Sequence, residues 1–472
     1  LDTIKEPLAV RSSSLLEDSQ YHPFAGVYET YMIPNNHANP LIRLNDLLNA
    51  IKKVYASTFY QSAKRYINIT SYRLEEEKMA VIVQKMIGIK HENRYYPDFS
   101  GVAKSYNFYP LDPQKPGDGI VSVALGLGKT VVDGGATVRF VPKYSQDIVQ
   151  FYSTKETLQN SQTKFYALQL DVQADFGTET YDTLLKKYNL KTAEEDGSLN
   201  YVGSTFSPEN DMIYEGLSRQ GPRVVSFSPI LKSKIFPLPS ILELILDMGS
   251  WGMGTPIEIE FAANLSVAAG APKEFALLQL RPLVVSHEKA DFKIETHSDD
   301  ELICRSEKTL GHGVIENIYD IILVDYEEFE RSKSREVADE VSQYNAEMMN
   351  EEKPYLLIGV GRWGSQDPWL GIPVKWEEIA GAKAIVEASF KDLSVEPSQG
   401  SHFFQNITSF MVGYFTINSF KNDGFLNWEW LLKKETADKK KYTRHVYFEK
   451  PIIVKMDGHN NVGIILKPES ES

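Results

Sequence analysis

The chain has 472 residues, of which 42% are hydrophobic, so it can build more than one packed core, and we expect two to four domains. Its formal net charge of −14 excludes a broad nucleic-acid-binding surface, which would need clustered Lys and Arg. A single cysteine, Cys304, excludes an internal disulfide and a cysteine-based metal cluster, and we expect it to fill a core.

The apolar runs are too short for a membrane-spanning helix, which needs about 18 to 20 consecutive apolar residues. The first residues are too polar for a secretory signal. We therefore expect a soluble, cytoplasmic protein with no membrane partner. Because the chain opens at Leu1 without a methionine and soon reaches a strand-like motif, we also expect that a segment precedes it in the natural protein.

The first motif follows a short apolar strand that begins at Pro7. Arg11 and two small hydroxyl residues, Ser12 and Ser13, come directly after its apolar residues, and a Phe-Ala-Gly turn ends at Gly26. Arginine supplies a planar fork that grips phosphate, and a glycine lets backbone N–H groups approach an anion. The motif therefore suits the binding of a polyphosphate.

The elements that follow mix helices and strands. Apolar residues recur at spacings of three and four from Leu41 to Tyr66, which predicts one amphipathic helix. The β-branched run from Met79 to Ile87 and the stretch SGVAKSYNFYP predict strands. From Ile120 to Pro142 the pattern predicts a strand, a glycine loop that faces a ligand, a short helix, a glycine turn and a second strand.

The next segments lead to the first domain boundary. The polar stretch from Leu158 to Asn200 predicts an exposed segment, or an insertion, of unreadable function. A helix with a glycine stop is expected from Ile241 to Gly252, and two strands, Pro256 to Ala263 and Phe275 to Val285, are expected to pair as a hairpin. We place the boundary near Ser286, so that the first domain covers residues 1–285.

Residues 286–472 predict a second, smaller α/β domain of unknown role. Apolar strands return in IYDIILVDY and PYLLIGVGRWG, and Arg335 to Asn350 predicts a helix. The runs VYFEKPIIVKM and VGIILKP predict a final strand pair. No internal repeat or low-complexity tract is present.

The predicted hairpin carries the clearest chemistry. Residues two apart on a strand share a face, so Glu258 and Glu260 would project together with Cα atoms roughly 6.5 Å apart. Gln279 and Arg281 follow the same rule on the partner strand, and a suitable register sets them beside the carboxylates. Magnesium is commonly held by one or two carboxylates plus substrate phosphates. The alternative is an exposed strand face whose two carboxylates are balanced by Arg281.

Several motifs together resemble the ATP-binding domain of the phosphoenolpyruvate synthase and pyruvate phosphate dikinase family. They occur in the family's order from about residue 7 to 285: AVRSSSLLEDS with FAGVYET, VIVQKM, SGVAKSYN, GLGKTVVDGG, EIEFA and LQLRP. The resemblance implies an α/β (α+β) fold with an ATP-grasp-like nucleotide-binding domain. It also implies an ATP-dependent phosphotransferase, a kinase that uses ATP and Mg²⁺ and whose acceptor in this family is pyruvate.

The resemblance also implies roles for individual residues. Arg11 and Arg281 would bind phosphate and stabilise charge during transfer, which needs positioning rather than a protein nucleophile. Glu260 and Gln279 would hold magnesium, with Glu258 nearby. The remaining ATP-binding positions are the adenine-contacting linker of Gln84, Lys85 and Met86, and the phosphate-contacting Ser13, Gly26 and Ser105.

Two parts of the family pattern are absent from the sequence. Family members carry an upstream segment with a phosphate-contacting lysine, and Lys5 is too close to Arg11 to be that residue. They also pass the phosphoryl group to a histidine in a Thr-Ser-His-Ala or Thr-Cys-His-Ala motif, and then to pyruvate in a barrel domain. Other domains would have to supply both functions. His402 and His312 are candidate acceptors, and a structural or surface histidine is the alternative for each.

Two further glycine motifs do not fit the patterns of other nucleotide-binding folds. GLGKT lacks the first glycine of a P-loop, since that position is Val123. Gly359, Gly361 and Gly364 have the dinucleotide-binding spacing, but prolines follow where a helix is needed, so a tight turn is expected. The tryptophan-rich loop that follows is expected to contact a ligand or to pack as an aromatic cluster.

Two alternatives to the leading function remain. The chain could be a non-catalytic ATP-binding sensor or regulatory module, or a phosphotransferase with a different small-molecule acceptor. The sequence does not choose among acceptors or oligomeric states.

Overall fold

The structure of the protein is a computed structural model. It describes residues 1–472 apart from positions 15, 18–25, 69–72, 74–76, 112, 149–150, 152–153, 173–183, 269, 284–293, 296, 391–393, 398, 400, 411, 420–422, 459 and 469–472. Contacts within the chain define two compact units. The N-terminal unit comprises Leu1–Val132 and Ala136–Leu283, and the C-terminal unit comprises Asp133–Gly135 and Val284–Ser472. The boundary that the sequence predicts near Ser286 falls outside the described residues.

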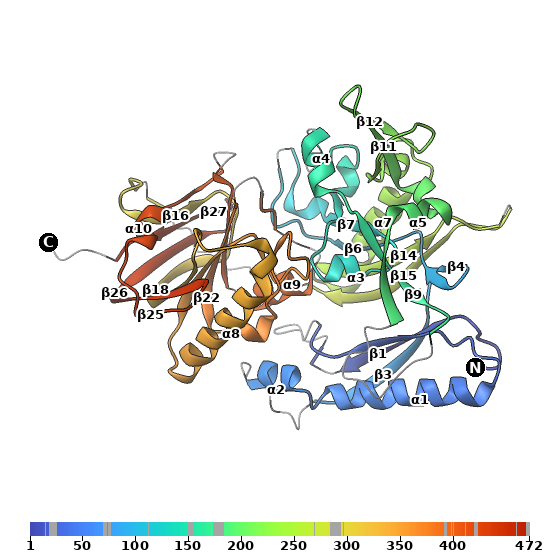
Figure 1. The fold of residues 1–472 in the computed structure, drawn as a ribbon, viewed down its shortest axis with the longest axis horizontal. Helices are drawn as coiled ribbons and strands as arrows, with labels where there is room; N and C mark the ends of the chain where they lie inside the picture. Colours follow the sequence, from blue (N-terminus) through green and yellow to red (C-terminus); the bar gives the residue numbers. More distant parts are fainter. Residues whose placement is uncertain are drawn as a thin grey trace. The chain divides into compact units, whose positions relative to one another are not determined.

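Both units combine helices with sheets, which confirms the predicted α/β class (Figure 1). Four sheets form the described part of the N-terminal unit. The first sheet has the strand order β2 (Thr30–Ile33), β1 (Leu8–Ser14), β3 (Met79–Lys85), and the second has the order β10 (Leu185–Asn189), β9 (Lys164–Gln169), β5 (Arg94–Tyr96), β4 (Ile89–His91). The third sheet has the order β12 (Met212–Glu215), β11 (Gly203–Ser207), β13 (Arg223–Val225). The fourth, five-stranded sheet has the order β15 (Glu274–Pro282), β14 (Ile257–Asn264), β6 (Phe99–Lys104), β7 (Ile120–Leu125), β8 (Val138–Phe140). Its helices are α1 (Pro40–Ser57), α2 (Gln61–Asn68), α3 (Lys129–Val132), α4 (Thr154–Asn160), α5 (Leu190–Glu195), α6 (Ser228–Leu231) and α7 (Leu238–Met253).

The helix predicted from Leu41 to Tyr66 is instead two helices, α1 and α2. Asn39 caps the start of α1, where its side chain accepts a hydrogen bond from the Leu41 N–H. At the other end the Thr58 N–H donates to the Tyr55 carbonyl, an i to i−3 bond that tightens the last turn and ends the helix. The periodic spacing of apolar residues continues across this break, which is why the pattern alone predicts one helix.

The five-stranded sheet supplies the core next to the candidate site. Ile257, Ile259 and Phe261 are fully buried on one face of β14, as the alternation of the strand predicts. Helix α7 packs against β14, and a Cβ at Gly249 would lie 2.4 Å from the Ile257 side chain, so the small residue permits this close approach. The predicted hairpin of β14 and β15 is confirmed, and so is the strand, loop, short helix and strand of β7, α3 and β8.

The prediction that the segment from Leu158 to Asn200 is surface-exposed is wrong for part of it. Strand β9 lies in this segment, and its Phe165, Ala167 and Leu168 side chains are fully buried in the main core of the N-terminal unit. These few apolar anchors stand among many charged residues, so the average composition of the stretch conceals a buried strand. Within its described part the segment belongs to the fold of the unit.

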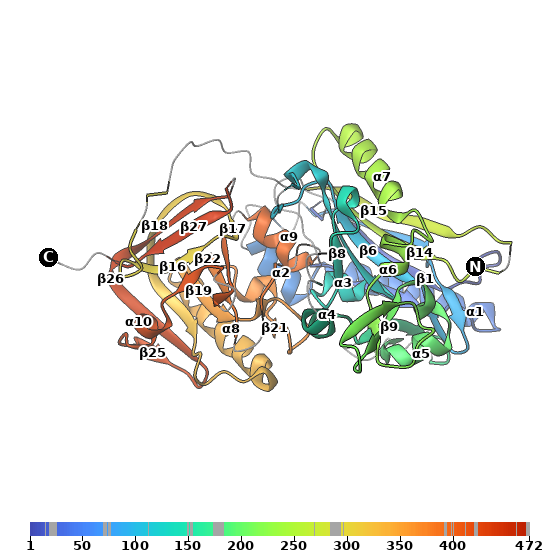
Figure 2. The same cartoon turned by 90° about the horizontal axis from the view of Figure 1, so that it is seen from above.

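The C-terminal unit is built on one large mixed sheet, along which helix α8 runs (Figure 2). Strands β18, β19, β22 and β23 are parallel neighbours, and β26 and β27 form the antiparallel pair that the sequence predicts. The described strands are β16 (Leu302–Ser306), β17 (Thr309–Leu310), β18 (His312–Val324), β19 (Tyr355–Val360), β20 (Arg362–Trp363), β21 (Gly371–Ile372), β22 (Ala382–Ala388), β23 (Gly413–Ile417), β24 (Phe425–Leu426), β25 (Asp438–Lys439), β26 (Thr443–Asp457) and β27 (Val462–Leu466). The helices are α8 (Ser334–Asn350), α9 (His402–Ser409) and α10 (Trp428–Leu432).

The smaller predictions for this unit can be compared with the structure. The short strand β20, rather than a helix, follows β19, and Gly361 and Gly364 both have φ of +75°, so the expected tight turn is confirmed. Cys304 is fully buried in the core, and burial raises the pKa of its thiol. His402 begins α9, and His312 Nδ1 lies 3.8 Å from an Asp457 carboxylate oxygen. Of the helices described, none is long and apolar enough to cross a membrane.

Glu387 on β22 gives the stability of this unit an expected pH dependence. Its side chain is 1% exposed and accepts a hydrogen bond of 2.7 Å from the Trp363 N–H. Burial raises the pKa of this carboxyl to about 7, and hydrogen bonds from Tyr414 and Trp363 and the charge of Arg362 oppose the rise only in part. Between its ordinary pKa near 4.5 and this value the folded state binds more protons than the unfolded state, so the unfolding free energy falls as the pH rises.

We therefore expect Glu387→Gln to flatten this pH dependence. At pH 8 the variant should be more stable than the wild type by up to about 3 kcal/mol, and at pH 4 the two should be similar. Urea unfolding followed by tryptophan fluorescence at several pH values measures the effect. Glu449→Gln, which changes an exposed carboxylate of the same unit, is the control. Equal pH dependence of wild type and Glu387→Gln would contradict this account.

Candidate functional site

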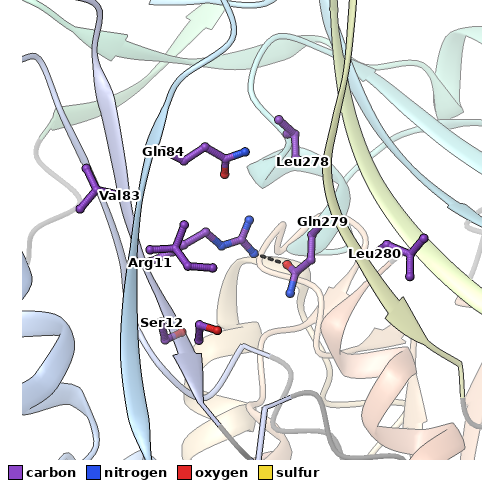
Figure 3. Close-up of a pocket in the computed structure, with 9 residues that line it drawn as sticks. Arg11, Ser12, Val83, Gln84, Leu278, Gln279 and Leu280 are labelled. Carbon is purple, nitrogen blue, oxygen red and sulfur yellow. Dashed lines mark hydrogen bonds between the residues drawn. The ribbon is translucent and has the colours of Figure 1, made fainter. Parts of the chain in front are cut away.

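A cavity of about 350 Å³ lies in the N-terminal unit between strands β1 and β3 on one side and β15 on the other (Figure 3). Its size is in the range of small-molecule sites, which are typically about 300 to 1,000 Å³. The lining residues are Arg11, Ser12, Ser13, Ile82, Val83, Gln84, Leu278, Gln279 and Leu280. They include several of the residues that the sequence predicts for an ATP site.

Strand β1 presents Arg11 to the cavity because its other face is anchored in a core. Leu8 and Val10 are buried in a hydrophobic cluster with residues of α1, so Arg11, which alternates with them, projects to the opposite side. Ser13 lies two residues further on the same face. On β3, Gln84 pairs with Ala9 of β1, which places the Gln84 side chain on the cavity side (Figure 3).

The register of β14 and β15 sets the predicted polar residues opposite one another. Glu258 pairs with Arg281, and Glu260 pairs with Gln279. The register then shifts, because Phe261 pairs with Leu277 and leaves Leu278 without a partner on β14. Such bulges re-aim side chains and are common beside active sites, and Leu278 lines the cavity here.

Four predicted residues from three strands meet beside the cavity, and two of them, Arg11 and Gln279, line it. Arg11 Nη2 donates a hydrogen bond to Gln279 Oε1 (Figure 3), and Arg281 Nη2 donates to the same oxygen at 2.5 Å. Arg281 Nη2 also donates to Glu260 Oε1 at 3.1 Å, and Arg11 Nη2 lies 3.9 Å from Glu260 Oε2. The two guanidinium groups therefore share one carboxylate and one amide oxygen.

The charges of this cluster suit an anionic ligand that carries a metal ion. Two guanidinium groups and one carboxylate leave a net positive charge, and the Arg281 side chain is only 3% exposed, so its field is weakly screened. Glu260 and Gln279 offer the hard oxygen atoms that magnesium prefers. The described residues contain no group of three or more His, Cys, Asp or Glu placed to hold a metal ion, so a cation here would take further ligands from a bound phosphate.

Glu258 lies on the same strand but is paired differently. Glu258 is 4% exposed, and its Oε2 lies 2.9 Å from Nζ of Lys104, which faces it on β6. Lys104, itself 1% exposed, was not predicted from the sequence. The sequence signal that could have indicated its role is the position of this lysine directly after the apolar run SGVA. A lysine at the end of a buried strand needs an oppositely charged partner.

Ser105, Lys85 and Met86 are not among the residues that line the cavity. The Ser105 hydroxyl accepts a hydrogen bond of 2.8 Å from the Ile257 N–H and so ties β6 to β14. Lys85 is exposed, with its Nζ 3.9 Å from a Glu6 carboxylate oxygen, and the Met86 N–H donates to the Pro7 carbonyl. Of the predicted linker, Gln84 lines the cavity.

Gly26 follows residues that lie outside the described part of the chain. It is exposed and has φ of +68°, a left-handed conformation that glycine adopts without strain. The conformation fits the Phe-Ala-Gly turn predicted at this position.

Comparisons with known proteins agree with this chemistry. The family described as "Pyruvate phosphate dikinase, AMP/ATP-binding domain" matches residues 2–302. The uncharacterized phosphotransferase YvkC of Bacillus subtilis is 30% identical over 156 residues, which cover 33% of this chain and 17% of that protein. Rifampicin phosphotransferase of Bacillus cereus is 30% identical over 128 residues, or 27% of this chain and 12% of that protein. A probable phosphoenolpyruvate synthase of Archaeoglobus fulgidus is 30% identical over 130 residues, or 28% and 15%.

The matched stretches thus span less than a fifth of the length of these relatives. The family match is broader, since it extends over more than half of the chain and contains every residue of the polar cluster. The protein belongs to the family of the pyruvate phosphate dikinase AMP/ATP-binding domain, a family of ATP-binding phosphotransferases.

Proposed function

We propose that the N-terminal unit binds ATP with Mg²⁺ in the cavity between β1, β3 and β15, as the nucleotide half of a phosphotransferase that resembles phosphoenolpyruvate synthase. The observation that carries the proposal is the convergence of Arg11 and Arg281 on Glu260 and Gln279. Two cations and two hard oxygen ligands grouped beside one cavity, which Arg11 and Gln279 line, suit a magnesium triphosphate. The nucleotide-binding domain, with its ATP-grasp-like fold, extends to about residue 285.

The residues take complementary roles in this proposal. Arg11 and Arg281 bind phosphate oxygens and stabilise the charge that develops during transfer. Glu260 and Gln279 hold the magnesium ion, which neutralises phosphate charge when it is bound. The hydrogen bonds that these four side chains now make with one another are exchanged for bonds to the ligand. The surrounding contacts come from Ser13, Gly26 and Ser105 toward the phosphates and from Gln84, Lys85 and Met86 toward the base.

The phosphoryl acceptor is proposed to be pyruvate or another small molecule. Two of the relatives are named as a probable phosphoenolpyruvate synthase and a rifampicin phosphotransferase, so similar nucleotide domains occur in proteins with different acceptors. In the first case a phosphohistidine domain and a pyruvate-binding domain outside this chain complete the reaction. His402 and His312 lie in the C-terminal unit and are not needed by this proposal.

Calorimetric titration of ATP into the chain, with magnesium and then with excess EDTA, tests the proposal. We expect one site per chain, with tighter binding when magnesium is present because Glu260 and Gln279 then contribute. Titration with GTP compares the base preference of the same cavity. A folded chain that takes up no ATP under either condition would contradict the proposal.

Turnover then separates a phosphotransferase from a sensor. The chain is incubated with ATP, magnesium and pyruvate, and the nucleotide products are separated by chromatography. Magnesium-dependent loss of ATP supports the phosphotransferase, and an increase of this loss with pyruvate only when phosphohistidine and pyruvate-binding domains are added supports pyruvate as the acceptor. ATP that binds but is never consumed, even when separate phosphohistidine and pyruvate-binding domains are added, supports the regulatory alternative.

A further inference from the structure

Three neighbouring strands carry a row of buried charges beside the proposed nucleotide site. Lys104 of β6 faces Glu258 of β14, and Glu258 faces Arg281 of β15. Their exposed fractions are 1%, 4% and 3%. The next residue pair on the same face of β14 and β15 is Glu260 and Gln279, which belong to the polar cluster of the cavity. Glu258 therefore lies between an ammonium group and a guanidinium group.

The two cations of this row, Lys104 and Arg281, form ion pairs with different carboxylates. Lys104 Nζ lies 2.9 Å from Glu258 Oε2. Arg281 Nη2 donates to Glu260 Oε1 at 3.1 Å and to Oε1 of Gln279, which lines the cavity, at 2.5 Å. Lys104 thus neutralises one carboxylate, while the guanidinium group that faces the same carboxylate is directed to the other one.

The cost of a buried charge explains why this division matters. A buried carboxylate that loses its cation is strongly destabilised, and it attracts any cation within reach. Without Lys104, the cation at the facing position of Glu258 is Arg281. A guanidinium group has a fixed fork of donors, so donors turned toward Glu258 are lost to the cavity.

We propose that Lys104 is a positioning residue, which holds Glu258 and thereby keeps the Arg281 guanidinium directed at the bound phosphates. The inference rests on the proposed nucleotide site and adds a residue that does not touch the ligand. It also gives the two carboxylates of β14 different tasks. Glu260 serves the metal ion, and Glu258 serves as the partner of Lys104.

Three variants test the inference by ATP titration below the lowest melting temperature of the set. Lys104→Met should weaken ATP binding by on the order of tenfold, since Glu258 then draws charge-assisted hydrogen bonds away from the phosphates. Glu258→Gln should bind ATP like the wild type and keep its magnesium dependence, because the neutral amide does not compete for Arg281. Lys104→Met combined with Glu258→Gln should recover the wild-type affinity.

Stability measurements on the same variants show what a purely structural role would do. Thermal melting should fall for Lys104→Met, which leaves a buried charge unpaired, and should recover in the double variant. A structural role alone predicts that every folded variant binds ATP equally well. Lys104→Arg keeps a cation opposite Glu258 and is the control for a substitution at this position. It should retain the ATP affinity whether Lys104 has a positioning role or a purely structural one.

The outcomes separate this inference from the function on which it rests. A folded wild type that binds no ATP overturns the proposed function itself. A wild type that binds ATP together with a folded Lys104→Met variant of equal affinity overturns the positioning role alone. The positioning role is also overturned if the double variant regains its melting temperature but not its affinity. If Lys104→Met does not fold, the double variant keeps the inference testable, because a folded double variant that binds ATP more weakly than the wild type overturns the positioning role.

Discussion

Replacing Arg281 by methionine is expected to weaken ATP binding by on the order of 100-fold, because a buried arginine makes two or more charge-assisted hydrogen bonds to phosphate. Arg281 is 3% exposed, so water contributes little to stabilising an anion bound beside its guanidinium group. Methionine keeps most of the volume of the side chain and removes its charge. Calorimetric titration of ATP in the presence of magnesium measures the loss.

Arg305→Met is the matched control for this variant. Arg305 lies on β16 of the C-terminal unit, its side chain is 44% exposed, and it pairs with Asp299 at 2.7 Å. Removing a surface ion pair of this kind changes stability little, and the nucleotide site is unaffected. An Arg281→Met variant that melts like the wild type and still binds ATP with wild-type affinity would show that Arg281 has no part in the site.

Replacing Phe261 by alanine is expected to lower the free energy of unfolding of the N-terminal unit by about 3 to 5 kcal/mol. Phe261 is fully buried, and its ring stacks on Phe275 with centroids 5.4 Å apart. A Cβ at Gly101 would lie 2.5 Å from the Phe261 ring, so strand β6 approaches the ring closely and little space is available for repacking. Urea unfolding followed by circular dichroism measures the change.

The effect should also reach the nucleotide site, because Glu260 and Phe261 are consecutive on β14. Phe59→Ala is the control, since Phe59 is 61% exposed and a substitution at such a position usually changes stability by less than about 0.5 kcal/mol. If Phe261→Ala unfolds at the same urea concentration as Phe59→Ala, the core assigned to the five-stranded sheet is wrong.

The candidate site could be predicted from the sequence where strand alternation and ordered motifs agree. Glu258, Glu260, Gln279 and Arg281 alternate with apolar residues, so the common face of the polar residues on each strand follows from the period of two. Arg11 was predicted from its motif with Ser12 and Ser13, although the sequence placed this motif after an apolar strand and the structure places it within β1. The family resemblance supplies what alternation cannot, which is that β1 meets the hairpin.

The features that the sequence did not reveal depend on distant partners. Lys104 is a lone lysine at the end of a strand, and only the pairing of β6 with β14 shows which carboxylate it meets. Phe165 and its buried neighbours are few among polar residues, and their burial depends on sheet contacts with β5 and on the core of the unit. The end of α1 at Thr58 is a local cap that the apolar spacing does not record.

A crystal structure of the chain with Mn²⁺ and a non-hydrolysable ATP analogue tests the central claim most directly, because manganese can be located by its anomalous scattering. We expect the triphosphate to lie against Arg11 and Arg281, with the manganese peak beside Glu260 and Gln279 and the base toward Gln84. A nucleotide bound elsewhere on the N-terminal unit, with the hydrogen bonds among these side chains unchanged, would contradict the claim.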